Sequence, residues 1–123
     1  MLHEMSRFED ALAVAEKLVV LNPYDAVAHN NKGVMLRELA LHVRAETALR
    51  RALEINGDFH DARANLALVL IERGDLASAQ DELEIVLARA PNHVDARWNR
   101  AILNLLQGKF VEGWRDYGSR LDY

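Results

Sequence analysis

Small residues recur along this chain at a fixed interval of 34 positions, and this period constrains the fold more than any other feature of the sequence. Two of the series are Ala11, Ala45, Ala79 and Gly113, and Gly33, Ala67 and Ala101. Small side chains recur where helix backbones approach closely, because larger ones would push the helices apart and open gaps. A repeat of this length therefore indicates supersecondary units stacked in a row.

Each unit is predicted to hold two helices. From Ala26 onward, apolar residues recur at spacings of three and four, as in amphipathic helices, with a break near residues 40–42. In the next unit the break falls at Gly74 and Asp75, since glycine can form a left-handed C-cap and aspartate can cap the following helix. Gly108 plays the same part in the last unit. The units end at the helix breakers Asn22-Pro23, Asn56-Gly57 and Ala90-Pro91.

These units divide one domain that spans residues 1–123. Residues 26–59 and 60–93 form two complete units, and residues 94–123 form a third that ends in an aromatic helix. Projecting the period backwards makes residues 1–25 a half unit with only its second helix, which is expected to start near Ser6. We therefore expect an all-α chain of antiparallel helix hairpins, with about seven helices.

On these residues the chain resembles the bacterial type of tetratricopeptide repeat (TPR). The residues that fit the pattern of this family are Gly33, Ala45, Ala52, Ala67, Leu70, Ala79, Pro91 and Ala101. The family's tryptophan near the start of the first helix is replaced by His29, Arg63 and Arg97. The resemblance implies a right-handed α-solenoid, the TPR superhelix, in which the first helix of each unit lines a concave groove.

A third series, Asn31, Asn65 and Asn99, has no packing reason and is predicted to lie in this groove. Helices in contact lie about 8–10 Å apart and an extended peptide advances about 3.3 Å per residue, so one amide per unit would meet roughly every third peptide residue. The series resembles the asparagine ladder of the O-linked N-acetylglucosamine transferases, which holds extended peptides by their backbone. The expected peptide-binding residues are Asn30, Asn31, Val34, Asn65, Leu68, Trp98, Asn99 and Ile102.

Two alternatives for these residues stay open. Each asparagine can instead bond a neighbouring helix or loop and hold the stack in register. Trp98 can equally be a core or inter-unit residue rather than an anchor for a ligand.

The last expected helix carries an aromatic stripe of Phe110, Trp114 and Tyr117, at spacings of four and three. A terminal unit of a solenoid has only one neighbour, so we expect this stripe to form an interface with another chain or domain, the alternative being that it turns inward. Residues 106–120 also resemble the closing repeat of bacterial TPR proteins whose array precedes a glycosyltransferase-like domain. That resemblance implies a fragment or a shortened relative without the enzyme.

Composition argues against several classes of function. The chain has 123 residues, no cysteine and a formal net charge of −4. The five histidines lack the paired spacing of metal ligands, and no nucleophile has an evident base, so we expect no catalytic residue, metal or cofactor. The acidic balance disfavours nucleic acid, and no basic amphipathic helix or long apolar segment points to a membrane. The first ten residues are acidic, whereas a signal peptide begins with a basic segment, so the cytoplasm is the expected location.

Two functions remain. The first is a non-catalytic protein–protein interaction module that binds a peptide or partner protein in the concave groove. The second is a structural or self-associating module that forms homo-oligomers, or docks onto a catalytic, glycosyltransferase-like domain, through its terminal helices.

Overall fold

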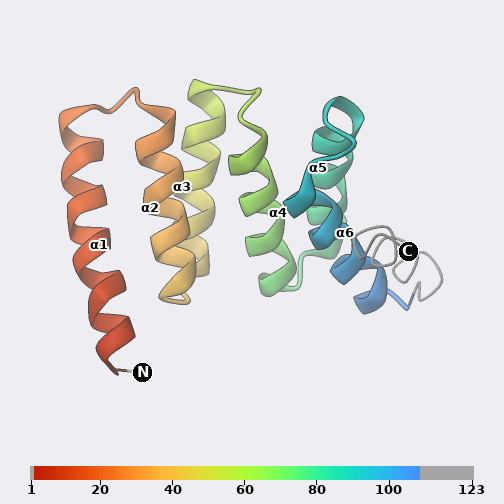
Figure 1. The fold of residues 1–123 in the computed structure, drawn as a ribbon, viewed down its shortest axis with the longest axis horizontal. Helices are drawn as coiled ribbons and strands as arrows, with labels where there is room; N and C mark the ends of the chain where they lie inside the picture. Colours follow the sequence, from red (N-terminus) through yellow and green to blue (C-terminus); the bar gives the residue numbers. More distant parts are fainter. Residues whose placement is uncertain (1, 109–123) are drawn as a thin grey trace.

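Six α-helices lie side by side in a row in the computed structural model, which describes residues 2–108 and their side chains from Arg7 onward (Figure 1). Their bounds are α1 Leu2–Leu21, α2 Ala26–Glu38, α3 His42–Ile55, α4 His60–Arg73, α5 Leu76–Arg89 and α6 Val94–Leu106. The described residues contain no strand, so this part of the chain is the all-α solenoid that the sequence predicts. Phe110, Trp114 and Tyr117, and with them the seventh expected helix, lie outside the described residues.

The first helices begin at Ala26, His60 and Val94, one period apart. Two of them are capped by side chains: Asp25 Oδ1 accepts from the Val27 amide at 3.0 Å, and His93 Nδ1 accepts from the Ala96 amide at 3.1 Å. Helix α1 begins at Leu2, four residues before the expected start. Leucine, glutamate and methionine are good helix formers, and no turn residue precedes Ser6 to stop the helix.

The breaks between the paired helices have one geometry. Gly74 has φ +86°, and the Asp75 amide donates to the Leu70 carbonyl at 2.9 Å. In the preceding unit Ala40 has φ +60°, and the Leu41 amide donates to the Leu36 carbonyl at 2.9 Å. Both are left-handed caps, which glycine adopts freely and alanine adopts only with strain. The predicted caps at Gly74 and Asp75 are confirmed, because the Asp75 side chain also accepts from the Ser78 amide at 3.3 Å.

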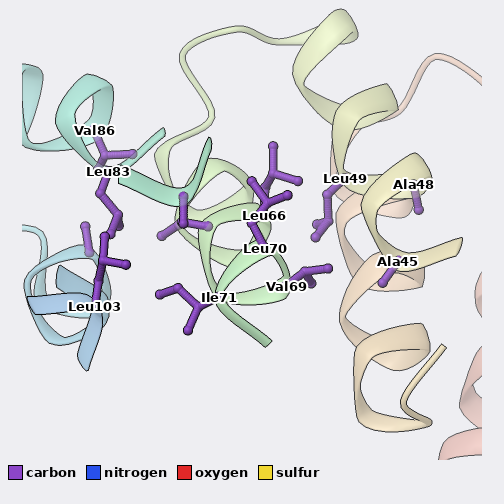
Figure 2. Packing of buried hydrophobic residues seen from close by; sticks show 14 of the residues in the cluster. Ala45, Ala48, Leu49, Leu66, Val69, Leu70, Ile71, Leu83, Val86 and Leu103 are labelled. Carbon is purple, nitrogen blue, oxygen red and sulfur yellow. The ribbon is translucent and has the colours of Figure 1, made fainter. Parts of the chain in front are cut away.

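One hydrophobic core runs through the row (Figure 2). The largest fully buried side chains are Leu36, Leu49, Leu66, Val69, Leu70, Leu83, Val86 and Leu103. Ala45, Ala67 and Ala79 are also fully buried, as the small-residue series predicts. Helices α2 and α3 approach so closely at Gly33 that an added Cβ would lie 2.6 Å from Leu49 Cγ. Close helix contact therefore explains the small-residue series.

The first helices lie on the inner side of a bend. Helix α4 contacts both α2 and α6, whereas α3 and α5, the second helices of adjacent units, have no Cα atoms within 8 Å of each other. A row whose first helices touch and whose second helices diverge curves toward the first helices. We call the side of α2, α4 and α6 that carries the predicted peptide-binding residues the inner face.

Candidate functional site

The inner face collects the predicted binding residues on three neighbouring first helices. Helix α2 carries Asn30, Asn31 and Val34, α4 carries Asn65 and Leu68, and α6 carries Trp98, Asn99 and Ile102. Asn31 is exposed, Trp98 is 37% exposed and Asn99 is buried, while the remaining five are half-buried. The face is therefore a partly open strip in which apolar side chains alternate with amides.

Two of the three asparagines in the series bond the preceding first helix. Asn65 Nδ2 donates to Asn30 Oδ1 at 3.1 Å, and Asn99 Nδ2 donates to the Ala64 carbonyl at 3.1 Å. Asn30 and Ala64 are equivalent residues, because each directly precedes the asparagine of its unit. The same contact is thus made twice, once to a side chain and once to the backbone, as the register alternative described.

Asn31 differs from the other two, since no first helix precedes α2 within residues 2–108. Its side chain makes no hydrogen bond within this range, and the whole amide is exposed. Each amide has two N–H donors and an acceptor oxygen, so the inter-helix bond of Asn65 leaves a second donor. Availability to a ligand decreases from Asn31 to Asn65 to the buried Asn99.

Polar side chains at the place of the family's tryptophan tie two of the three first helices, α2 and α4, to the turn before them, which the sequence did not lead us to expect. His29 Nε2 donates to the Pro23 carbonyl at 2.9 Å, and Arg63 Nη2 donates to the Gly57 carbonyl at 3.1 Å. Both reach back six residues. The sequence signal for these contacts was a polar residue six positions after Pro23 and after Gly57, the residues that close a unit. The pattern can be interpreted only when the folded turn brings the two positions together.

Helix α1 has an uncovered apolar side. Val14 and Leu18 are 58% and 43% exposed, whereas the equivalent Ala48 and Ala52 of α3 are 6% and 0% exposed. Helix α3 packs against α2, the first helix of its own unit, but within residues 2–108 α1 has no such helix. The side of α1 that corresponds to a hairpin contact therefore faces solvent.

The described side chains form no group of three histidines, aspartates or glutamates able to hold a metal ion. None of the six helices combines the length and the apolar character that a bilayer crossing requires.

Comparison with known proteins places this geometry in a family. Two models described as tetratricopeptide repeat match the chain, one over residues 41–105 and one over residues 4–58. Among curated proteins, Protein FlbA of Caulobacter vibrioides is 27% identical over 123 residues, which cover 97% of this chain and 20% of FlbA. Mouse Protein arginine N-methyltransferase 9 is 35% identical over 75 residues, covering 58% of this chain and 9% of that protein. The chain thus spans a fifth or less of these relatives.

Solved structures show the same fold. MamA superposes with a TM-score of 0.79 at 24% identity, covering 94% of this chain and 63% of MamA. The O-GlcNAc transferase of Thermobaculum terrenum gives 0.73 at 22% identity, covering 83% of this chain and 20% of that chain. YrrB, described as a TPR protein with an unusual peptide-binding site, gives 0.52 at 19% identity over 94% of this chain and 77% of YrrB.

Proposed function

Because this chain belongs to the tetratricopeptide repeat family, whose members are generally non-catalytic interaction scaffolds, we propose that its inner face binds an extended peptide segment of a partner protein. The fold is that of a protein–protein interaction module; the peptide, the inner face and a cytoplasmic location are the proposal. The observation that carries it is the partly open strip of amides and apolar side chains along α2, α4 and α6.

The chemistry of the inner face fits a peptide backbone. An amide side chain donates and accepts, as a peptide unit does, and Asn31 offers both functions to solvent. Val34, Leu68 and Ile102 occupy equivalent positions beside the amides and offer apolar contacts for peptide side chains. Three first helices at about 8–10 Å spacing accommodate roughly eight extended residues. Each amide bond contributes about 1 kcal/mol, so we expect weak, sequence-tolerant binding.

One of two similar structures is described with a ligand of the proposed kind. YrrB is described as having a peptide-binding site, and the O-GlcNAc transferase shares the fold of this chain. Neither fixes the ligand of this chain, which is why the proposal is limited to an extended peptide.

The test is selection from a phage-displayed library of random peptides, followed by fluorescence polarisation with the enriched peptides. Asn31→Ala with Trp98→Ala should lower affinity about tenfold or more, since an anchor and an accessible amide are lost together. Asn92→Ala is the matched control, because Asn92 is exposed in the turn before α6 and lies off the inner face. Equal binding by the double variant, or no enrichment with the unmodified chain, would overturn the proposal.

A second function, self-association, is favoured by the uncovered side of α1. The residues of this side follow spacings of three and four: Arg7, Asp10, Ala11, Val14, Lys17, Leu18 and Leu21. In an antiparallel pair of α1 helices centred on Val14, Lys17 lies within one residue, about 1.5 Å along the axis, of the level of the partner subunit's Asp10, and Leu18 is equally close to the level of the partner subunit's Ala11. The surface is thus complementary to itself in charge and in size, and a second copy of the chain is the occupant that we propose.

Light scattering across a concentration series tests this second function. A dimer should form as concentration rises, Lys17→Asp should weaken it, and Lys17→Asp with Asp10→Lys should restore it by re-forming the pair with reversed sign. Val20→Glu is the control, since Val20 is 79% exposed on another side of α1. A monomeric mass at all concentrations would refute self-association and leave the peptide proposal intact.

A further inference from the structure

A cavity with a basic wall lies between α2 and α3, away from the inner face. Its volume is about 390 Å³. It is lined by His29, Lys32, Leu36, Val43, Arg44, Thr47, Ala48, Arg51 and Glu54. None of the predicted peptide-binding residues contributes to this lining, so the cavity belongs to a different surface.

The next unit shows what fills the corresponding place. There Arg63 donates to Glu82 Oε1 at 2.6 Å, with both side chains largely buried. Leu66, three residues after Arg63 on α4, is fully buried. In the unit of the cavity the equivalent of Glu82 is Ala48, and the equivalent of Leu66 is Lys32. In the first complete unit His29 therefore stands in place of Arg63, a lysine replaces the buried leucine, and the carboxylate of Glu82 has no counterpart.

The cationic groups around the cavity are paired to different extents. Arg51 donates to Glu54 at 3.0 Å and lies over the Tyr24 ring at 5.8 Å. Arg44 is 3.9 Å from Glu16, at the limit of an ion pair. The ammonium of Lys32 makes no hydrogen bond or ion pair within the described residues, although the side chain is half-buried.

We propose that this cavity binds an acidic side chain of a partner protein, whose carboxylate occupies the place that Glu82 holds in the next unit. Lys32 is the main electrostatic partner, because a half-buried unpaired ammonium gains most from a carboxylate. His29 is already engaged by the Pro23 carbonyl, and it forms the wall of the cavity while Leu36 and Val43 supply apolar contacts. The site is independent of the inner face, and its test does not depend on the peptide proposal.

The probe is the capped dipeptide acetyl-Phe-Glu-amide. Its binding to the full chain is measured by ¹⁵N–¹H NMR titration. Amide shifts should be confined to residues lining the cavity. Acetyl-Phe-Gln-amide, which has the same shape without the charge, should bind about tenfold more weakly. Acetyl-Phe-Gln with a free C-terminal carboxylate tests the other possible source of a carboxylate, the C-terminus of a partner chain. It should also bind about tenfold more weakly than the glutamate probe.

Two variants examine the assignment of residues. Lys32→Gln removes the positive charge, and Ala48→Glu supplies an internal carboxylate like that of Glu82. Each should lower the affinity for the glutamate probe about tenfold. Arg89→Gln is the matched control, because Arg89 is 65% exposed on α5 and does not line the cavity, and it should leave binding unchanged. Thermal unfolding of each variant shows whether the fold is retained.

The proposal fails if the glutamine probe binds as tightly as the glutamate probe, if the free C-terminus binds better, or if the shifts map to the inner face. It also fails if Arg89→Gln weakens binding as much as Lys32→Gln, or if the unmodified chain shows no shifts. Shifts on the inner face would point to the peptide site instead. The other outcomes do not bear on peptide binding at the inner face, whose test uses Asn31 and Trp98.

Discussion

The side-chain amide of Asn65 donates to Oδ1 of Asn30 across 3.1 Å and so joins the first helices of two successive units. Asn99 repeats the contact one unit further, with the Ala64 carbonyl as acceptor. A residue series that suggested ligand binding therefore also sets the register of the stack. The two roles are compatible, because a primary amide has more hydrogen-bonding groups than one inter-helix contact uses.

The asparagines should differ in their contribution to stability. Asn99→Ala removes a buried hydrogen bond and should lower the free energy of unfolding by about 1–2 kcal/mol. Asn31→Ala removes no hydrogen bond within the described residues and should change the free energy of unfolding by less than about 0.5 kcal/mol. Urea unfolding of the two variants measures the difference. Equal losses would contradict the register role of Asn99.

Replacing Ala40 by glycine should stabilise the chain. Ala40 has φ +60°, and this left-handed conformation costs alanine roughly 1 kcal/mol of stability but is unstrained for glycine. Chemical unfolding of Ala40→Gly should therefore show a gain of about 1 kcal/mol. Ala88→Gly, at an exposed position inside α5, is the control and should lose about 1 kcal/mol. A loss at both positions would show that the cap is not left-handed.

Adding a methyl group at Gly33 should destabilise the chain despite the better helix propensity of alanine. The gain in propensity is about 1 kcal/mol, but the new Cβ would meet Leu49 Cγ at 2.6 Å in the closed core, and overpacking costs about 1–3 kcal/mol. We expect a net loss of about 1 kcal/mol in Gly33→Ala.

Leu49→Ala provides the test of that mechanism. Its own loss should be about 3 kcal/mol, and adding Gly33→Ala to it should cost nothing further or recover some stability, because the clash has gone. Additive losses in the double-mutant cycle would show that Gly33 is required for another reason.

The ion pair of Arg63 and Glu82 should matter more than the exposed pair of Arg89 and Asp58. Glu82→Gln leaves a largely buried guanidinium without its charged partner and should lower the free energy of unfolding by about 1–3 kcal/mol. Asp58→Asn, in a pair whose side chains are 65% and 72% exposed, should have little effect on stability. Thermal unfolding at two salt concentrations distinguishes them. A larger loss at Asp58 would contradict this ranking of the two pairs.

Much of the fold followed from local sequence. The 34-residue period predicted the hairpins, and Gly74 and Asp75 predicted a cap and a start, since each needs only the conformation of its own backbone. Ala40 shows the limit of such reasoning, because its residue type gives no hint of a positive φ. The chain adopts it there to close the same turn that Gly74 closes in the next unit.

The candidate site was predicted less completely. The sequence placed Asn31, Asn65 and Asn99 on equivalent positions of the first helices, but it did not reveal that Asn65 and Asn99 each bond the unit before them. Nor did it reveal the cavity that is lined by Lys32 and by Ala48, the short equivalent of Glu82. Both features depend on which side chains face each other across helices far apart in the chain.

The sequence by itself thus determined the repeat, the helices and the positions where their backbones meet, because periodic patterns and cap residues act over a few neighbouring positions. Only the tertiary structure decided which amides bond the neighbouring unit, which side of α1 stays uncovered and where a cavity with a basic wall lies. These outcomes depend on packing between units, which single residues and their immediate neighbours do not encode.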